Sequence, residues 1–199
     1  MAYAAEMLAR AGVGALTLID DDTVSVSNLN RQLIATTKTL GMAKTDAAAN
    51  RFRDINPDIS LSLYNMFYLP GNADLIDLSG FDYVIDAIDT VSAKLEIISR
   101  CKSLGVPVIS SMGTGNKLDP SELTVTDIYK TSLCPLARVM RQECRRRGIV
   151  SLKVVYSTEP PVEPDRELSE GLDEEDGKRK KLPPASNSFV PATAGLLIA

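Results

Sequence analysis

Acidic and basic side chains follow two predicted strands closely enough to form a site for a charged ligand. Asp20 and Asp22 come directly after the apolar residues 16–19, Arg31 follows in the next loop, and Asp89 lies just beyond the apolar residues 83–87. In open α/β sheets ligands bind at the carboxyl ends of the strands. A carboxylate there can bind ribose hydroxyls or Mg²⁺, and a guanidinium can bind phosphate through two hydrogen bonds. These residues predict a site for a nucleoside triphosphate and its metal ion.

Three further polar residues, Asn28, Gln32 and Lys44, lie in the same part of the sequence. Lys44 is near a predicted helix start and supplies a second cation for phosphate. An isolated Asp after a strand is commonly a turn residue or a helix cap, so each residue alone is weak evidence. Their convergence on one sheet edge favours the site. Asp86 lies inside the strand and is interpreted as structural, so Asp89 is the preferred metal ligand.

The composition excludes several kinds of catalysis. The chain of 199 residues has no histidine, which rules out Ser-His-Asp and Cys-His mechanisms and removes the commonest zinc ligand. Acid–base chemistry must then use carboxylates, Lys, Tyr or metal-bound water. Cys101, Cys134 and Cys144 form no CxxC pair, so we expect neither a structural zinc nor a disulfide framework.

Length, charge and hydropathy predict an ordinary single domain. The net charge is −4, and no apolar run approaches the ~18 residues that a membrane span requires. The N-terminus carries no basic segment leading into an apolar one, as a signal peptide would. We therefore expect a cytoplasmic chain, with membrane attachment through residues outside it left open.

Helical and extended patterns alternate along residues 1–122, the predicted nucleotide-binding half. Helices are expected at 3–10, 42–54 and 92–104, and strands at 16–19, 59–64, 83–87 and 106–110. Apolar runs without polar alternation, such as YVIDAI, are typical of strands covered on both faces. The fold class is therefore α/β, with a doubly wound, mostly parallel, Rossmann-like sheet.

Residues 123–199 form a predicted substrate or dimer half of the same domain. Strands are expected at 123–128 and 152–157, with helices at 135–147 and 187–199. Between them, 13 of the 20 residues at 163–182 are charged. Such a stretch buries too little apolar surface to offset its ordering entropy, so it is predicted to be a mobile loop.

Three motifs in this sequence resemble one known family. They are the run D-x-D-x-V-x-x-S-N-x-x-R-Q at 20–32, the G-x-x-K at 41–44 and the D-A-x-D at 86–89. All three resemble the adenylating domain shared by ubiquitin-activating enzymes and bacterial activators of sulfur-carrier proteins. The resemblance implies ATP and Mg²⁺ as cofactors. It assigns these roles: Asp20 on the ribose, Asp22 and Asn28 ordering the site, Arg31 and Lys44 on the phosphates, Gln32 supporting them, and Asp89 on magnesium.

A closer resemblance covers nearly the whole chain. Residues 110–121, 127–141, 153–161 and 186–199 are similar to the tRNA threonylcarbamoyladenosine dehydratase branch. This implies an ATP-dependent, ligase-like tRNA-modifying enzyme that activates the carboxylate of the threonylcarbamoyl group and cyclises it with loss of water. It also implies a homodimer, with tRNA as the macromolecular substrate and no zinc.

The family's glycine-rich phosphate loop normally lies immediately before the segment that matches Tyr3. Here the first strand and that loop would lie before Met1, and the last apolar helix stops at Ala199 without a cap. We therefore expect the natural protein to extend in both directions. Because backbone N–H groups of the loop cradle phosphate, the 199-residue chain is expected to bind ATP weakly or not at all.

Two other functions stay open at this stage. One is an adenylyltransferase for the C-terminus of a ubiquitin-like sulfur-carrier protein, and the other is a non-catalytic dimerisation domain without a phosphate loop. A dinucleotide-dependent dehydrogenase is disfavoured, because Arg31, Lys44 and Asp89 suit a triphosphate and metal better.

Two motifs outside this site are ambiguous. The five arginines at 138–147 suit either tRNA phosphates or a solvated helix face that complements the helix dipole. Cys134 suits a thioester-forming nucleophile, but without a histidine to activate it we favour a packed thiol. The glycine turn at 112–115 could line the substrate pocket, with Lys117, Asp119 and Lys130 as candidate contacts.

Overall fold

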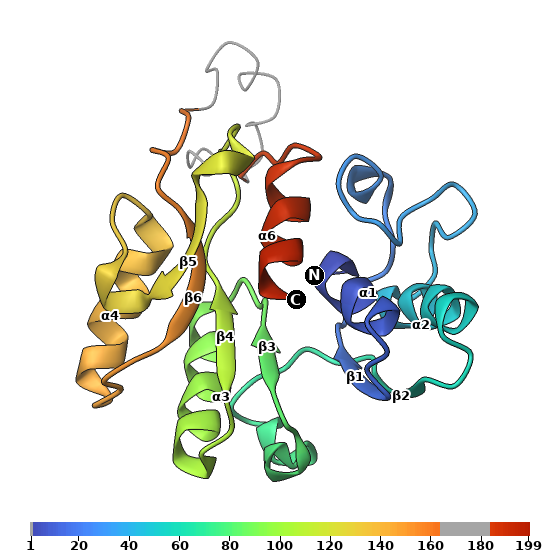
Figure 1. Cartoon of the computed structure of the whole chain (residues 1–199), viewed down its shortest axis with the longest axis horizontal. Coiled ribbons are helices and arrows are strands. Elements are labelled where there is room, and N and C mark those ends of the chain that lie inside the picture. Colours follow the sequence, from blue (N-terminus) through green and yellow to red (C-terminus); the bar gives the residue numbers. More distant parts are fainter. Residues whose placement is uncertain (1, 164–183) are drawn as a thin grey trace, which may run out of the picture.

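The computed structural model describes residues 2–163 and 184–199, and it alternates helices with strands along the chain (Figure 1). The predicted loop at 163–182 lies outside the described residues except for Glu163. The helices are α1 (Ala2–Arg10), α2 (Lys44–Ile55), α3 (Val91–Leu104), α4 (Pro135–Arg146) and α6 (Val190–Ile198). The strands are β1 (Ala15–Ile19), β2 (Ser60–Tyr64), β3 (Val84–Asp86), β4 (Val108–Ser111), β5 (Leu123–Asp127) and β6 (Lys153–Ser157). Short 3-10 helices are η1 (Val26–Asn28), η2 (Ala73–Leu75), η3 (Leu78–Gly80), η4 (Pro120–Glu122) and η5 (Ile128–Lys130).

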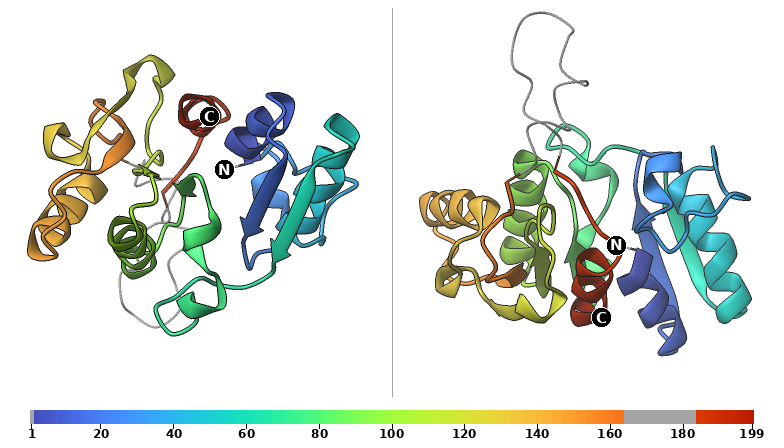
Figure 2. Two further views of the ribbon diagram at one scale, coloured as in Figure 1. Left: turned by 60° about the horizontal axis from the view of Figure 1, so that its bottom comes forward. Right: turned by 90° about the horizontal axis from the view of Figure 1, so that it is seen from above.

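The strands form two sheets that lie side by side (Figure 2). β1 and β2 pair in parallel, and the larger sheet has the order β3-β4-β6-β5, in which β5 alone is antiparallel. The predicted α/β class with a mostly parallel sheet is confirmed. The division falls between β1 and β3, and the residues of β1 are half-buried or exposed although their sequence, ALTLI, is mostly apolar.

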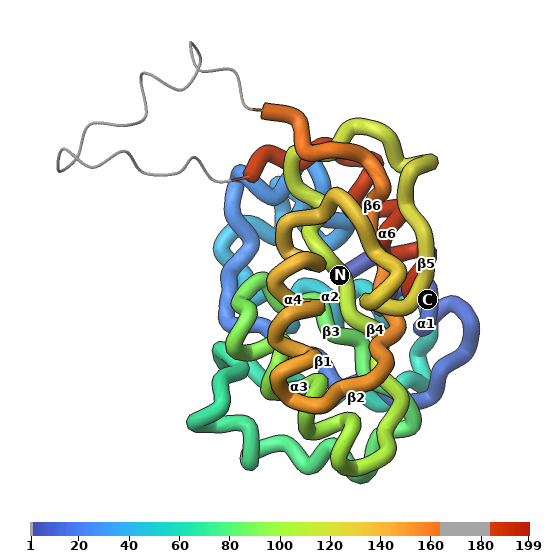
Figure 3. The backbone as a smooth tube through the Cα atoms, turned by 90° about the vertical axis from the view of Figure 1, so that its left-hand side faces the viewer, coloured from blue at the N-terminus to red at the C-terminus, as the bar shows by residue number. Residues whose placement is uncertain are grey.

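Helices cover both faces of the larger sheet. Val154 and Tyr156 of β6 belong to the core cluster that includes residues of α3 and α4, whereas Val155 packs in the cluster that includes α6. Neighbouring strand residues point to opposite faces, so a continuous apolar run is required where both faces are covered. The view along the sheet shows α3 and α4 on one side of these strands (Figure 3).

The helix α6 links the two sheets through α1. α1 and α6 lie side by side (Figure 1), and a Cβ atom on Gly195 would stand 2.7 Å from the Tyr3 Cβ. Only glycine at this position lets the two helices approach so closely. This contact brings the C-terminal segment next to the β1–α2 region that carries the predicted site.

One buried carboxylate also ties α1 to α2. The Glu6 side chain is 3% exposed, lies 2.7 Å from Arg10 Nη2 and forms a second ion pair with Arg51 of α2. Burial raises the pKa of Glu6, but hydrogen bonds and charges from Arg51 and Arg10 outweigh it, so the pKa is lowered overall. The folded state therefore holds Glu6 in its ionised form.

We predict that Glu6→Gln lowers the free energy of unfolding by roughly 2 kcal/mol, less than for a fully buried pair because both arginines keep contact with water. Since the folded pKa lies below the unfolded value, the stabilisation by Glu6 is present above about pH 4.5 and is lost as the pH falls through the folded pKa. Urea unfolding at pH 7 and pH 3.5 checks this. A gap between wild type and Glu6→Gln that is equally large at both pH values would contradict the account.

Candidate functional site

The structure brings Asp20, Asp22 and Lys44 together at the carboxyl end of β1. The Lys44 Nζ lies 2.5 Å from Asp22 Oδ2 and 3.9 Å from Asp20 Oδ1. The backbone N–H of Asp22 donates to Asp20 Oδ1 at 3.0 Å. The predicted grouping of two carboxylates and an ammonium is therefore present, with the lysine 12% exposed and both carboxylates open to solvent.

Main-chain hydrogen bonds hold this group in place. The N–H of Lys44 donates to the Asp22 carbonyl at 2.9 Å, and the N–H of Val24 donates to the Met42 carbonyl at 2.8 Å. Thr23 and Ala43 form an isolated antiparallel bridge. The segment after β1 is thus fastened to the first residues of α2, and Lys44 is the first residue of that helix.

Asp20, Asp21 and Asp22 form the one group of potential metal ligands found in the described part of the chain. A carboxylate oxygen from each lies within 4.8 Å of the others. Oxygen ligands of this kind suit Mg²⁺. The predicted metal ligand, Asp89, is not a member of this group. It is exposed in the loop between β3 and α3.

Asn28 organises the loop that carries Arg31 and Gln32. Its side chain is buried and accepts the N–H of Ser25 at 3.1 Å, while its carbonyl accepts the N–H groups of Arg31 and Gln32 at 3.1 and 2.9 Å. Asn28 thus fixes the conformation of its own loop, and its role toward a ligand stays a prediction. The Arg31 guanidinium donates to the Ser27 carbonyl at 2.7 Å, so it is engaged with its own loop and does not join Lys44.

The same loop contacts the segment before α6, which the sequence did not predict. The Asn30 side chain donates to the Ser186 carbonyl at 2.9 Å, and the Ser188 hydroxyl donates to the Asn30 carbonyl. These residues are far apart in the chain, and no periodic pattern relates them. One partial indication of this contact is present in the sequence. Residues 186–189 (S-N-S-F) belong to a segment that resembles the dehydratase branch, but the resemblance assigns them no structural role.

Asp86 is buried inside the sheet, in keeping with the interpretation that Asp86 itself is not a ligand of the metal ion. Its side chain is fully buried and lies 3.0 Å from the Lys94 ammonium, which is fully buried as well. The burial of Lys94 is not predictable from the sequence, because a lysine inside a helix is usually solvated. Nothing in the local sequence signals that it points inward.

The glycine turn after β4 leads to a buried lysine. Lys117 is 2% exposed and its ammonium donates to the Glu159 carbonyl. Burial lowers the pKa of Lys117, and the nearby Cys134 and Glu159 partly counteract that effect. Asp119 caps η4 and accepts from Ser121, and Lys130 is exposed. The structure thus places the three candidate contacts in different environments.

The cysteines are packed rather than presented to solvent. Cys134 is 3% exposed and its Sγ accepts the N–H of Ala137 at 3.5 Å, capping α4. Burial raises the pKa of Cys144 and raises that of Cys101 to about 11. These positions support the interpretation of Cys134 as a packed thiol.

The arginines of α4 are largely engaged by neighbours. Glu143 lies 2.7 Å from Arg146 and 2.5 Å from Arg147, and the Arg145 guanidinium stacks 5.4 Å from the centre of the Tyr129 ring. Arg141 donates to the Thr131 carbonyl at 2.8 Å. This pattern favours a solvated, internally paired helix face over a row of free cations for RNA.

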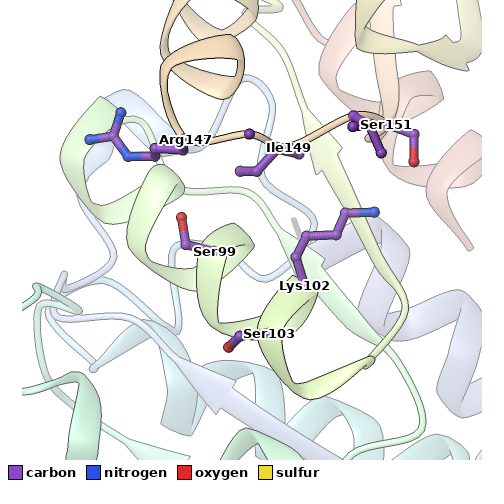
Figure 4. Close-up of a pocket in the computed structure, with 8 residues that line it drawn as sticks. Ser99, Lys102, Ser103, Arg147, Ile149 and Ser151 are labelled. Carbon is purple, nitrogen blue, oxygen red and sulfur yellow. The ribbon is translucent and has the colours of Figure 1, made fainter.

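A shallow pocket lies between the C-terminal half of α3 and the α4–β6 connection, lined by Ser99, Lys102, Arg147 and Ser151 among others (Figure 4). α3 begins at the carboxyl edge of the sheet, and its 14 residues span about 20 Å. The pocket is therefore at the edge away from Asp20 and Asp89. Figure 4 shows the Arg147 and Lys102 head groups pointing in different directions, so they do not converge on one anion.

The sequence model of the ThiF family matches residues 2–198. The chain belongs to the ThiF family. It is 41% identical to the tRNA threonylcarbamoyladenosine dehydratase of Bacillus subtilis over 98% of this chain and 78% of that protein. It is 39% identical to the Escherichia coli dehydratase over 81% of this chain, a match that spans 63% of that relative.

Solved structures agree with these relationships. The fold matches that of the Escherichia coli dehydratase TcdA in complex with ATP, with a TM-score of 0.83 and 35% identity over 98% of this chain and 76% of that one. The sulfur carrier protein ThiS adenylyltransferase of Escherichia coli is 34% identical over 74% of this chain.

None of the helices in the described residues has the length and apolar character that a membrane crossing needs.

We predict that the native protein shows no fast-reacting thiol, because all three cysteines are buried. Ellman's reagent at pH 8 should react with three thiols only after unfolding in guanidinium. A fast reaction of one thiol in the native protein, abolished by Cys134→Ala, would instead identify Cys134 as a reactive nucleophile.

Proposed function

We propose that this chain is the ATP-using domain of a tRNA threonylcarbamoyladenosine dehydratase. The observation that carries the proposal is the 41% identity to the Bacillus subtilis dehydratase across 98% of the chain. The cluster of Asp20, Asp22 and Lys44 at the end of β1 supports it, because a nucleotide triphosphate needs both hydroxyl acceptors and cations. Residues 1–122 would bind the nucleotide, and residues 123–199 would serve substrate binding and dimer formation.

The residues present fit ATP and Mg²⁺. Asp20 would accept hydrogen bonds from the ribose hydroxyls, and Lys44 and Arg31 would neutralise the phosphates. In the structure, Asp22 holds the Lys44 ammonium in place through an ion pair. Asn28 and Gln32 would support this loop. Asp89 would hold magnesium, whose chemistry is to neutralise charge on the phosphates. Arg31 must leave the Ser27 carbonyl to reach a ligand.

The reaction follows from the chemistry of the carboxylate. A carboxylate is a poor electrophile, so one of its oxygens first attacks a phosphorus of ATP and displaces the rest of the nucleotide or pyrophosphate. A neighbouring nucleophilic atom of the modified adenosine then attacks the activated carbonyl and closes the ring. The oxygen leaves bonded to phosphorus, so the nucleoside has lost one water in total. Because the chain has no histidine, any proton transfer falls to carboxylates, lysine, tyrosine or metal-bound water.

We propose in addition that the protein acts as a homodimer in the cytoplasm. The exposed Leu196 and Leu197 of α6 would be covered by contact with a second copy. The resemblance to the dehydratase branch supports the same arrangement. Sedimentation velocity measures the oligomeric state directly, and a monomer at all concentrations would contradict it.

A second candidate function is adenylyl transfer to a sulfur-carrier protein. The 34% identity to the ThiS adenylyltransferase of Escherichia coli favours it as the runner-up. Both functions use the same nucleotide site, so the nucleotide site alone does not separate them. The macromolecular substrate does.

We predict that ATP turnover is stimulated by tRNA bearing threonylcarbamoyladenosine and not by a carrier protein ending in Gly-Gly. The protein assayed is a chimera in which a family member's first strand and glycine-rich loop are added before residue 1. Turnover is measured as phosphate or pyrophosphate release with each partner at equal concentration, and unmodified tRNA is the control. Stimulation by the carrier protein alone would reverse the order of the two candidates. Absence of turnover with both would favour a non-catalytic dimerisation domain.

We predict that Lys44→Met weakens ATP binding about tenfold or more, because a charge-assisted hydrogen bond to phosphate is lost. The matched control is Lys38→Met, which removes an exposed charge from the same β1–α2 connection. Titration calorimetry with ATP and Mg²⁺ measures both, in this chain and in a chimera with a family member's strand and glycine-rich loop added before residue 1. Equal affinities for the two variants in the chimera would contradict the assignment of Lys44.

A further inference from the structure

Behind the proposed site, three side chains form a buried polar group at the start of α3. Asp86 of β3 accepts a hydrogen bond from the Ser110 hydroxyl of β4 at 2.5 Å and pairs with the Lys94 ammonium of α3 at 3.0 Å. All three side chains are completely or almost completely buried. Asp86 and Ser110 are direct partners in the parallel register of β3 and β4.

The second oxygen of Asp86 shapes the segment that carries Asp89. The N–H of Ile88 donates to Asp86 Oδ1 at 3.0 Å, which closes a tight turn immediately before Asp89. Thr90 follows as the N-cap residue, and the N–H of Lys94 donates to its carbonyl at 3.0 Å. One carboxylate therefore holds both ends of this connection, the main chain at Ile88 and the first turn of α3 through Lys94.

The buried pair of Asp86 and Lys94 is an inefficient way to stabilise the folded state. Removing two charges from water costs several kcal/mol per ion, and apolar pairs of the same size are often equally or more stabilising. A lysine in the first turn of a helix is also disfavoured by the helix dipole. The charged group thus needs a reason beyond packing, and the turn that Asp86 closes through the Ile88 amide leads directly to Asp89.

We propose that Asp86, held by Lys94 and Ser110, is a positioning residue that fixes Asp89 and the N-terminus of α3 in the geometry the reaction needs. The inference rests on the proposed function, in which Asp89 faces the phosphates and their magnesium ion. Asp86 itself touches neither substrate nor metal. Its contribution passes through the Ile88 amide and the main chain.

Two double variants separate the effect of Asp86 on the position of Asp89 from its effect on folding. Asp86→Asn with Lys94→Met keeps a side-chain oxygen for the Ile88 amide, whereas Asp86→Leu with Lys94→Met removes it. Both double variants lack an unpaired buried charge, which is what makes single substitutions in such pairs destabilising. They differ in the acceptor for the Ile88 N–H and are otherwise close in size.

Each variant is made in the chimera that carries the glycine-rich loop before residue 1. Three properties of it are measured: thermal unfolding, amide hydrogen exchange at Ile88 and Asp89 without ligand, and kcat and KM for ATP in the dehydration of modified tRNA. We expect the Leu variant to lose about tenfold or more in kcat, because small misplacements of catalytic groups are costly, with little change in KM. Its Ile88 amide should exchange faster. The Asn variant should recover most of the lost kcat and the protection of Ile88.

The proposal is overturned if the folded Leu variant has the kcat and the Ile88 exchange of the wild type. If the Leu variant fails to fold, Ser110→Ala takes its place, because it removes one of the two hydrogen bonds that hold Asp86 Oδ2 without removing a charge. The expected result is then a drop in kcat of about threefold at unchanged KM, and an unchanged kcat overturns the proposal.

Asp89→Asn distinguishes the two possible failures. An unchanged kcat in Asp89→Asn contradicts the proposed role of Asp89 and with it this inference. A lowered kcat in Asp89→Asn, together with a wild-type Leu variant, contradicts the positioning role of Asp86 alone and leaves the proposed function standing.

Discussion

The short antiparallel pairing between residues 23–24 and 42–43 determines where the charged side chains of the site lie. It closes the long connection after β1, and it sets the Asp22 carbonyl 2.9 Å from the N–H of Lys44. Without this pairing, Lys44 would have no fixed position relative to the two aspartates. With it, an ammonium and two carboxylates share one strand end. The nucleotide chemistry proposed for the chain depends on that closure.

Charge pairing reduces the electrostatic repulsion within this acidic group. Lys44 offsets part of the repulsion among Asp20, Asp21 and Asp22, and the ion pair with Asp22 fixes the position of the lysine ammonium. A phosphate ligand would exchange one anionic partner of Lys44 for another. The Lys44 ammonium is thus already paired and largely removed from water before a ligand binds. Binding therefore requires little further desolvation of this ammonium, which limits the free-energy cost.

Much of the fold and of this site could be predicted from the sequence, for identifiable reasons. Apolar runs such as YVIDAI at 83–88 predict strands covered on both faces. In β3, Val84 does pack in the cluster with α3 and Ile85 in the cluster with α6. The D-x-D run and Lys44 predicted a shared strand end because their positions depend on local order along the chain. Lys94 could not be predicted, because its burial depends on Asp86 and Ser110 from other elements. The contact of Asn30 with Ser186 and Ser188 was missed for the same reason, and the division between β1 and β3 appears only in the assembled sheets.

The measurement that tests the central claim most directly is nucleoside mass analysis of tRNA carrying threonylcarbamoyladenosine. The tRNA is incubated with ATP, Mg²⁺ and the chimera that carries a family member's first strand and glycine-rich loop before residue 1. The account predicts that the modified nucleoside loses the mass of one water, that the loss requires ATP, and that Lys44→Met abolishes most of it while Lys38→Met does not. An unchanged nucleoside mass in the presence of a protein that binds ATP would contradict the account.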